Sequence, residues 1–323
     1  MNLTVATLAS HTALQILRAA KKQGFKTAAI TEPGREKFYS SFGFIDKMYV
    51  ARPDELEMLV EPLRSENAVF IPHGSFVEYC GPRRAASFNI PFFGLRQLIG
   101  VEAVQAEKMA LLESAGIPTP KTFQTPEEAE PPVIVKLEGA KGGRGYLLAR
   151  DRKTLLEKLP PGPGYIIQEY VLGVPAYIHY FASPMFNRVE LFGADIRYES
   201  NVDGRILGLR EPSFVVVGNR PLVLRESLLP QLIEYGERFA SAVRKRLGRE
   251  MVGPFCLEAI ITDELEVKVF EFSGRIVAGT NVYMGVGSPY SALYFDGLMD
   301  MGMRISLELK TALERNMLDS VTT

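Results

Sequence analysis

The first hundred residues alternate short β-rich runs with helical segments, and this alternation constrains the fold more than any other feature of the sequence. Residues 12–23 place apolar side chains at helical spacing and end at Gly24, which is typical of a helix. The β-rich runs around this helix read "LTVAT", "FKTAAIT", "KMYV", "AVFIP" and "PFFG". Strands that alternate with helices build βαβ units, in which the strands run parallel. The sequence therefore predicts an α/β domain with a parallel sheet over residues 1–100.

After this domain the pattern changes. A helix predicted over residues 102–114 stops at a cluster of glycine and proline, which marks a boundary. Residues 101–185 are predicted to form a small α+β domain together with this connecting helix, and residues 186–323 a larger domain rich in β structure. The larger domain contains an amphipathic helix near residues 228–247 and a terminal helix near residues 300–315.

The overall charge and the cysteine content exclude several classes of protein. The chain of 323 residues carries a formal net charge of −1, whereas nucleic-acid binders normally present a basic face. Two cysteines, Cys80 and Cys256, are too few for a disulfide framework and indicate a reducing compartment. No signal-peptide pattern is read at the start, and the most apolar later segment, residues 171–186, is interrupted by Gly, Pro and His. We expect a soluble cytoplasmic protein that binds neither nucleic acid nor membrane.

The segment "VKLEGAKGGRGYLLAR", residues 135–150, combines glycines with basic side chains between two apolar runs. Glycines let backbone amides approach a phosphate closely, and lysine and arginine supply positive charge. Neither a Walker A loop nor a Rossmann fingerprint fits, because no Gly-Lys-Ser/Thr is present and a strand, not a helix, follows the glycines. The hairpin resembles a protein-kinase glycine loop, but the other kinase motifs are missing. An exposed charged hairpin is the alternative interpretation of this loop alone.

Lys136 strengthens the case for a phosphate site. It closes the apolar run "PVIVK", so its side chain leaves a predicted strand directly before the glycine-rich loop. A fixed ammonium group beside a glycine-rich lid suits the phosphates of a nucleotide. We therefore expect this hairpin to bind a nucleotide.

Glu258 and Glu271 lie on two neighbouring strands predicted over residues 255–262 and 266–273. A joining loop with an even number of residues would place both on one face, opposite or diagonal to each other. Close carboxylates on a partly buried sheet repel each other unless a cation lies between them, and Mg²⁺ typically takes one or two carboxylates plus substrate phosphates. The alternative is a pair of solvated glutamates on an outer face, which an odd loop would favour. The pair is thus a candidate magnesium site.

Two turns in the first domain suit an anion. His11 lies between the first strand and the first helix, where a helix N-terminus favours negative charge, and Ser75 lies in the similar turn "PHGS". Turns that follow parallel strands share the carboxyl edge of the sheet, where ligands bind. Each turn alone is better explained as a helix cap, but together they fit the phosphate of a ribonucleotide. We assign structural roles to His73 and His179.

Taken together, the motifs resemble a known family. A lysine before a glycine-rich hairpin, then "IIQEYVLG", then two glutamates on neighbouring strands resembles the ATP-grasp superfamily. Over nearly its whole length the chain resembles the archaeal-type formate-dependent FAICAR synthetases of purine biosynthesis, the PurP family. The matching segments are "TLASHTALQILRAAKKQGF", "IPHGSFVEY", "KLEGAKGGRGY", "IQEYVLGVP", "RYESNVDG", "VVGNRPLVLRESLLP" and "SGRIVAGTN".

The resemblance implies a fold and a set of site residues. The fold is ATP-grasp, with α/β and α+β parts: an N-terminal pre-ATP parallel-sheet domain, a small lid domain and a large domain that carries the metal site. ATP, bound between the last two domains, would contact Lys136, Lys141, Gly142, Gly143, Gln168, Glu169, Tyr170, Val171 and Glu199. The substrate nucleotide would contact His11, Ser75 and Asn219, and Mg²⁺ or Mn²⁺ would be bound by Glu258 and Glu271. Arg275, catalytic together with Lys136, would steady an acyl phosphate or a transferred phosphoryl group.

The resemblance also implies a reaction. An ATP-dependent carbon–nitrogen ligase would join formate to the amino group of 5-aminoimidazole-4-carboxamide ribonucleotide (AICAR) and release the formamido product FAICAR, through formyl phosphate. The family relation further implies a homo-oligomer, a trimer or a hexamer.

Two positions and one segment depart from the family pattern. Gln105 and Ile196 stand where basic residues are expected, Lys108 is the only cation near the first of them, and the segment 204–212 is short. Two other hypotheses therefore stay open: a nucleotide-binding paralogue with altered or lost activity, and an ATP-grasp carboxylate–amine ligase for another substrate. A nucleotide-free α/β scaffold is the least specific alternative.

Overall fold

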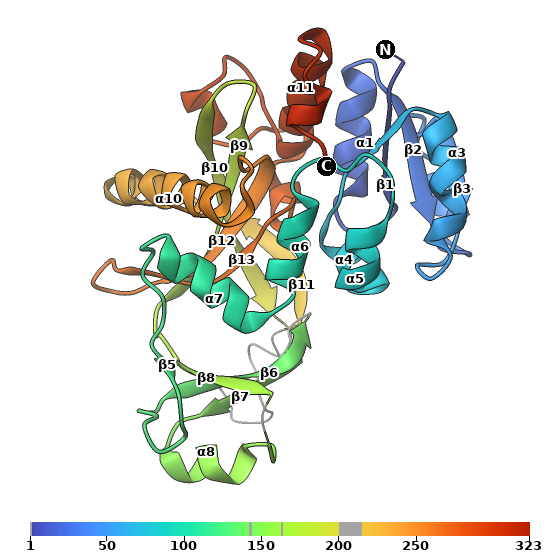
Figure 1. Ribbon diagram of the computed structural model, residues 1–323. Helices are drawn as coiled ribbons and strands as arrows, with labels where there is room; N and C mark the ends of the chain where they lie inside the picture. The colour runs from blue at the N-terminus through green and yellow to red at the C-terminus, as the bar shows by residue number, and fades with distance from the viewer. Residues whose placement is uncertain (1, 142–143, 163, 200–214) are drawn as a thin grey trace.

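The computed structural model describes residues 2–141, 144–162, 164–199 and 215–323, which form three β-sheets with helices packed against them (Figure 1). Gly142, Gly143 and the short segment 204–212 lie outside the described residues.

The first sheet is parallel and has the strand order β3-β2-β1-β4. Its strands are β1 (Thr4–Leu8), β2 (Lys26–Thr31), β3 (Lys47–Val50) and β4 (Ala68–Phe70). The surrounding helices are α1 (Ala13–Lys22), α2 (Glu36–Tyr39), α3 (Val60–Ser65), α4 (Gly74–Cys80) and α5 (Pro82–Ser87), with a 3-10 turn, η1 (Leu56–Leu59). Every residue of β1 is buried, as expected for a parallel strand that is covered on both faces. The predicted parallel sheet is confirmed.

The strand predicted at "PFFG" is wrong. Phe92 makes a single parallel bridge to Phe70, and Phe93 bridges Thr322 in the antiparallel direction. Gly94 then turns the chain with φ of +97°, a left-handed conformation that glycine adopts without a steric penalty. The segment therefore ties the first sheet to the C-terminal end of the chain and does not extend the sheet.

The helix predicted over residues 102–114 begins at Gln105, as α7 (Gln105–Ser114), and a separate helix, α6 (Arg96–Glu102), precedes it. The break falls at Val104, whose backbone is extended with φ of −117° and ψ of 118°. A β-branched residue loses side-chain freedom in a helix, which favours the break at this position. The two helices bring different side chains to the site described below.

The second sheet is antiparallel and has the order β5-β8-β6-β7. Its elements are β5 (Thr122–Phe123), β6 (Val133–Lys141), β7 (Arg144–Ala149), α8 (Arg152–Lys158) and β8 (Tyr165–Glu169). The Asp151 carboxylate caps α8 by accepting from Thr154 N at 2.7 Å. In Figure 1 this unit hangs below the others, with α8 at its outer end. It has a hydrophobic core of its own, built from Phe123, Ala129, Val133, Val135, Ala149, Leu155 and Ile167.

The third sheet is antiparallel and has the order β11-β10-β9-β12-β13. Its strands are β9 (Val174–Ser183), β10 (Arg188–Glu199), β11 (Val216–Pro221), β12 (Gly253–Ile261) and β13 (Val267–Ser273). Successive side chains point to opposite faces, so Tyr180 joins the core under α10 (Leu229–Leu247) while Phe181 joins the core under α11 (Met301–Glu314). This sheet is therefore covered by helices on both faces.

Both long helices of the large domain have a capping residue: Gly248 at the C-terminus of α10 and Asp300 at the N-terminus of α11. The predicted amphipathic helix α10 is confirmed: Leu232, Phe239 and Val243 are buried, and Gly248 closes it in a left-handed conformation. The Asp300 carboxylate caps α11 by accepting from Met303 N at 2.9 Å. The described residues of this part of the chain also form the 3-10 turns η2 (Glu226–Leu228), η3 (Ala278–Tyr283), η4 (Ser291–Leu293) and η5 (Leu318–Ser320). Among the described residues, none of the helices combines the length and the apolar character needed to cross a bilayer.

Candidate active site

Glu258 and Glu271 are direct cross-strand partners on β12 and β13. The loop between the strands, residues 262–266, has an odd length, and a regular ladder would place Glu258 opposite Phe270. The register shifts by one residue directly after Glu258, which is the geometry of a β-bulge. The bulge therefore brings both carboxylates to one face of the sheet although the loop is odd.

Each of these carboxylates is paired with a basic side chain. The Lys108 ammonium group on α7 donates to Glu271 Oε1. The Arg197 guanidinium on β10 donates to Glu258 Oε1 at 3.1 Å, and its Cζ lies 3.5 Å from the centroid of the Tyr177 ring. The aromatic face and the carboxylate fix the guanidinium between them.

Lys136 reaches the same cluster from the lid sheet. Its Nζ donates to Phe270 O at 3.2 Å and lies 5.3 Å from the centroid of that ring. Phe270 is the residue that the bulge inserts, and an inserted residue is left unpaired in the ladder. Lys136 is only 3% exposed, and burial lowers its pKa although Glu271 opposes the shift. One lysine thus links the glycine-rich hairpin to the carboxylate pair.

The pKa values of the two carboxylates move in opposite directions. Burial raises the pKa of Glu258 more than Arg197 lowers it, and the nearby charge of Glu271 adds to the rise. Burial acts on Glu271 in the same direction, but Lys108 and Lys136 outweigh it and hold the pKa of Glu271 below its usual range. Glu271 is therefore the carboxylate that stays ionised as the pH falls.

The donor set fits a hard divalent cation that is shared with a ligand. Glu258 and Glu271 supply carboxylate oxygens on one face, and within the described part of the chain no group of three or more His, Cys, Asp or Glu residues is placed to hold a metal. Mg²⁺ usually takes one or two carboxylates and completes its shell with water and substrate phosphates. The pair therefore suits a magnesium ion carried by a nucleotide better than an ion enclosed by protein alone.

Gln168 lies at the start of the predicted hinge and is buried on β8. Its Nε2 lies 3.5 Å from Pro120 O, and its Oε1 is buried without a hydrogen-bond partner among the described residues. A buried amide oxygen without a partner costs free energy unless a ligand or water supplies a donor.

In the rest of the predicted hinge, the side chain of Glu169 and the backbone amides of Glu169 and Tyr170 already have partners. The Glu169 carboxylate accepts from Lys121 N at 3.0 Å and from Lys268 Nζ at 2.8 Å, so it ties the lid to the large sheet. Tyr170 N donates to Pro132 O at 3.0 Å, and Val171 is the last residue of the predicted hinge.

A second cluster lies where the first sheet meets the segment after β13, joined by a parallel bridge between His73 and Ile276. The rings of His11 and His73 stack with centroids 5.2 Å apart and 9° between their planes. A Cβ built on Gly74 would lie 3.0 Å from His11 Nε2 and 3.3 Å from Arg275 Nη1. A side chain at this point would crowd both His11 and Arg275, so glycine lets the two groups approach the backbone closely.

Arg275 is held in this cluster by Glu102 at the end of α6. Arg275 Nη2 donates to Glu102 Oε1 at 2.7 Å, and Gly274 N donates to Glu102 Oε2 at 3.0 Å. Arg275 Nε is buried and has no hydrogen-bond partner in the described residues. Ser75 lies nearby and accepts a hydrogen bond from Ser10 Oγ at 3.3 Å.

The two histidines of this cluster are neutral at neutral pH. His73 Nε2 lies 2.8 Å from Leu8 O, and burial lowers the pKa of His73 to about 4. His11 is open to solvent, yet the atoms around it desolvate its ring and, with His73 and Arg275, hold its pKa well below the usual range. Its backbone has φ of +55°, and Asn281 Nδ2 donates to its carbonyl oxygen at 3.1 Å. A left-handed histidine is a strained conformation that occurs most often at functional sites.

Asn219 lies on β11 opposite Arg197, so a predicted substrate-binding residue neighbours the carboxylate cluster. Its Nδ2 donates to Asp195 Oδ2 at 2.7 Å, and Asp195 Oδ1 lies 2.7 Å from His179 Nε2. This buried chain orients the amide, and it gives His179 the structural role expected for it. Glu199 ends β10 close to this point.

The two clusters belong to one site. Ser273 Oγ, two residues before Arg275, donates to Glu258 Oε1 at 3.2 Å, so the segment that carries Arg275 adjoins the carboxylate pair. Of the predicted site residues, Lys136, Glu258, Glu271 and Asn219 lie in the cluster that contains Arg197, and His11 lies beside Arg275.

The sequence reasoning missed several side chains of the site. Asp195 and Arg197 alternate with apolar residues on β10, so a period of two could have found them on one face. No pattern in the sequence pointed to Glu102, because its contact with Arg275 depends on the break between α6 and α7. Gln105 begins α7 with its Oε1 buried and lacking a hydrogen-bond partner among the described residues, while Lys108, one turn later, supplies the buried cation.

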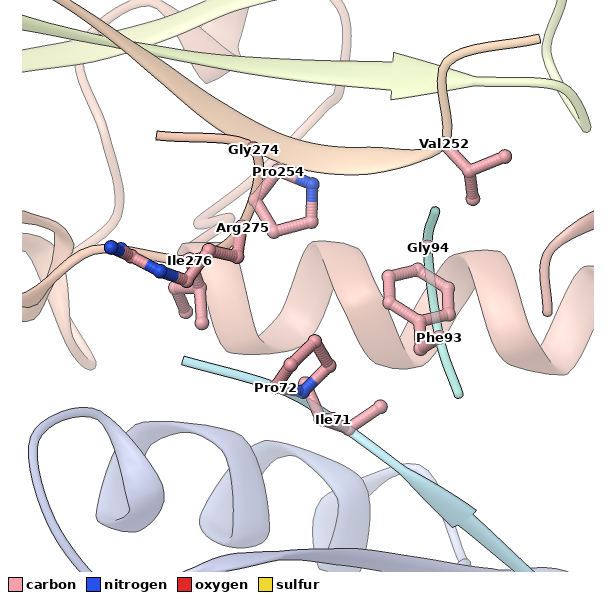
Figure 2. Close-up of a pocket in the computed structure, with 9 residues that line it drawn as sticks. All are labelled: Ile71, Pro72, Phe93, Gly94, Val252, Pro254, Gly274, Arg275 and Ile276. Carbon is pink, nitrogen blue, oxygen red and sulfur yellow. The ribbon is translucent and has the colours of Figure 1, made fainter. Parts of the chain in front are cut away.

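A small cavity beside Arg275 is too small for a nucleotide. Its volume is about 10 Å³, which holds about one water molecule. The guanidinium of Arg275 points away from the apolar side chains that form it (Figure 2). The cavity is a packing gap lined by Ile71, Pro72, Phe93, Gly94, Val252, Pro254, Gly274, Arg275 and Ile276.

Comparisons with known proteins cover nearly the whole chain. Two family models match it, "Protein of unknown function (DUF1246)" over residues 5–123 and "Domain of unknown function (DUF1297)" over residues 163–323. The 5-formaminoimidazole-4-carboxamide-1-(beta)-D-ribofuranosyl 5'-monophosphate synthetase of Pyrobaculum calidifontis is 59% identical over 322 residues, which are 99% of this chain and 96% of that protein. The protein of the same name from Ignicoccus hospitalis is 51% identical over 333 residues, 99% of this chain and 95% of that protein.

Solved structures agree with these relatives. The crystal structure of an IMP biosynthesis protein PurP from Thermococcus kodakaraensis has a TM-score of 0.81 and 35% identity, and the match covers 99% of this chain and 100% of that chain. The ADP complex of purK, an N5-carboxyaminoimidazole ribonucleotide synthetase, has a TM-score of 0.70 at 17% identity over 93% of this chain and 74% of that chain, and supports the fold alone. The predicted ATP-grasp fold is confirmed, as is the predicted family. The chain belongs to the PurP family of 5-formaminoimidazole-4-carboxamide-1-(beta)-D-ribofuranosyl 5'-monophosphate synthetases.

Proposed function

We propose that this chain is the ATP- and formate-dependent ligase that converts AICAR to FAICAR in purine biosynthesis. The observation that carries the proposal is the 59% and 51% identity, along the full chain, to proteins named as the synthetases of this product. The site supports it, because a lysine from the glycine-rich lid, a carboxylate pair and an arginine–histidine cluster gather in one place.

The reaction proceeds in two steps. One oxygen of formate attacks the γ-phosphorus of ATP, and ADP leaves, which gives formyl phosphate. The amino nitrogen of AICAR then attacks the formyl carbon, inorganic phosphate leaves, and the nitrogen loses a proton. The protein mainly positions the reactants and neutralises charge, as in other phosphoryl transfers.

Lys136 and the backbone of the loop that contains Lys141, Gly142 and Gly143 hold the phosphates of ATP. A lysine fixed by burial gives a positive charge that needs no reorganisation when negative charge moves onto the leaving ADP. Glu258 and Glu271 would hold Mg²⁺, or Mn²⁺ in its place, which would supply positive charge beside the transferred phosphoryl group.

The hinge receives the adenosine. Gln168 Oε1 and hinge residues 169–171 lie against the base, although the Glu169 carboxylate and the amides of Glu169 and Tyr170 already have protein partners. Glu199, at the end of β10, accepts from the ribose hydroxyls.

The substrate ribonucleotide is held by His11, Ser75 and Asn219. A neutral His11 contributes hydrogen bonds without adding charge, while Arg275 carries the positive charge that steadies formyl phosphate. Glu102 keeps the guanidinium of Arg275 in place.

The proposal includes assembly into a trimer or a hexamer, which light scattering at several protein concentrations tests. A single monomeric mass at every concentration would exclude this part of the proposal and leave the chemistry unaffected.

The activity is tested by incubating the protein with ATP, Mg²⁺, AICAR and formate and omitting each in turn. Phosphate release is followed together with the formylated product by mass spectrometry. Product that requires all four components establishes the synthetase. Thermal protection by ATP or AICAR without product would overturn the proposal in favour of a silent paralogue. ATP consumption with a different carboxylate or amine would overturn it in favour of another ligase.

A further inference from the structure

Lys108 is a buried cation whose position the proposed function does not explain. It is 5% exposed, and it comes from α7, outside the lid that supplies Lys136. Its ammonium group donates to Glu271 Oε1, an oxygen of the carboxylate pair. A lysine is almost never buried without a partner, so Glu271 accounts for its placement.

Glu271 cannot serve Lys108 and a divalent cation equally well. Two positive centres that share one carboxylate repel each other strongly where little water screens them. Arg197 is bound to Glu258 in a similar way, so both carboxylates of the pair carry a basic partner. Divalent metal must therefore compete with the protein's own cations for these oxygens.

A nucleotide changes this balance because its phosphates provide new anionic oxygens. Lys136 donates to Phe270 O, and Lys108 donates to the carboxylate of the next residue, Glu271, so both ammonium groups lie in one region. Two like charges held close together are stabilised by an anion between them. Charge-assisted hydrogen bonds to phosphate are among the strongest that an ammonium group makes.

We propose that Lys108 is an exchange residue: it neutralises Glu271 when no nucleotide is bound and moves to the nucleotide phosphates on binding, which frees Glu271 for the divalent cation. Metal binding then depends on nucleotide, and the protein alone holds metal only weakly at this pair. The inference rests on the proposed function only in that the site takes a nucleotide and a divalent cation; it does not depend on formate or AICAR.

The test measures two affinities separately for the wild type and for Lys108→Met. Mn²⁺ binding to the protein without nucleotide is followed by the paramagnetic resonance of free Mn²⁺, and ADP binding without metal by calorimetry. Exchange requires opposite changes in the variant: Mn²⁺ affinity without nucleotide rises about tenfold or more, while metal-free ADP affinity falls about tenfold, each equivalent to about 1.4 kcal/mol. A lysine that only stabilises the fold does not produce opposite changes in the two affinities.

The matched control is Arg246→Met. Arg246, on α10, pairs with Glu107, which lies on α7 next to Lys108. Both side chains of this pair are partly exposed and lie outside the cluster. This variant removes one cation–carboxylate pair from α7 and leaves both affinities within about twofold of the wild type.

Unchanged Mn²⁺ affinity in folded Lys108→Met would overturn the proposal, as would unchanged ADP affinity. If the Met variant is unstable, Lys108→Gln keeps a hydrogen-bond donor and most of the side-chain volume, and it is judged by the same two affinities. Both measurements omit formate and AICAR, so a protein that fails to make FAICAR can still confirm the exchange, and an active synthetase can still refute it.

Discussion

Glu258 and Glu271 face each other across β12 and β13 because a β-bulge offsets the odd length of the loop that joins these strands. The same bulge inserts Phe270, whose carbonyl oxygen accepts from Lys136. One irregularity of the sheet thus aligns the candidate metal ligands and anchors the lid lysine, in line with the tendency of bulges to occur beside active sites.

The first prediction concerns the charge of Glu271. Glu271→Gln keeps the shape of the side chain but removes the charge that balances Lys108 and Lys136. We expect FAICAR formation at saturating ATP to fall at least about 100-fold, because a neutral amide is a poor ligand for Mg²⁺. Initial rates over a range of Mg²⁺ concentrations measure the effect.

The control for this variant is Glu264→Gln, in the exposed tip of the same hairpin. It should retain the wild-type rate and Mg²⁺ dependence. A Glu271→Gln enzyme with an unchanged response to Mg²⁺ would show that the carboxylate does not bind the metal.

Local patterns in the sequence predicted the elements well, because each depends on near neighbours. The parallel strands, the lid strands and α10 follow from the periods of their apolar residues. Lys136 and Glu271 were found in the same way, since each stands at a defined point of a strand. The pairing of Glu258 with Glu271 was predicted only for an even loop, because a bulge in a ladder leaves no clear mark in composition.

Contacts between distant elements could not be predicted. Lys108 was noted only as a nearby cation, since its contact with Glu271 depends on how α7 packs against β13. The contact of Glu102 with Arg275 depends on the break at Val104, where a continuous helix was expected. Both contacts depend on tertiary packing, which the spacing of apolar residues along a single sequence does not reveal.

The second prediction concerns the side chain that positions Arg275. Glu102→Gln keeps an acceptor for Gly274 N but loses the charge that holds the guanidinium. We expect kcat to fall about 10- to 100-fold with the KM for ATP changed less than about twofold, because the arginine acts on the phosphoryl or acyl group in the transition state. Steady-state kinetics separate the two parameters.

Glu113→Gln, on the exposed side of α7, is the matched control and should leave both parameters unchanged. A rise in the KM for ATP with kcat preserved would instead assign Glu102 to ground-state binding. A lower kcat accompanied by a lower melting temperature would instead assign Glu102 a structural role.

The third prediction is a pH dependence of stability that comes from His73. Its pKa is about 4 in the folded protein, whereas an unfolded histidine titrates near 6.5. Between these values the unfolded chain binds the proton and the folded protein does not, so lower pH favours unfolding. We expect His73 to withdraw about 3 kcal/mol from the free energy of unfolding as the pH falls from 6.5 to 4, with no further loss below that range.

Urea unfolding of the wild type and of His73→Gln at several pH values measures this contribution together with the effect of His73 on the pKa of His11. Glutamine still offers a donor to Leu8 O, where His73 Nε2 lies. The variant should show the shallower dependence on pH between 6.5 and 4. Parallel curves for the two proteins would mean that His73 does not resist protonation.

The last prediction concerns the packing of α11 against α1. A Cβ on Gly302 would lie 2.4 Å from the backbone oxygen of Gln15, which cannot move without shifting α1 itself. Gly302→Ala should therefore lower the free energy of unfolding by about 1–3 kcal/mol through overpacking. Gly100→Ala is the matched control, since Gly100 lies in α6 and a Cβ there meets no atom within 4 Å. That control should raise the free energy of unfolding by about 0.5–1 kcal/mol, because alanine favours a helix over glycine. Thermal or urea unfolding gives both values, and a Gly302→Ala protein as stable as the wild type would show that the two helices can separate without cost.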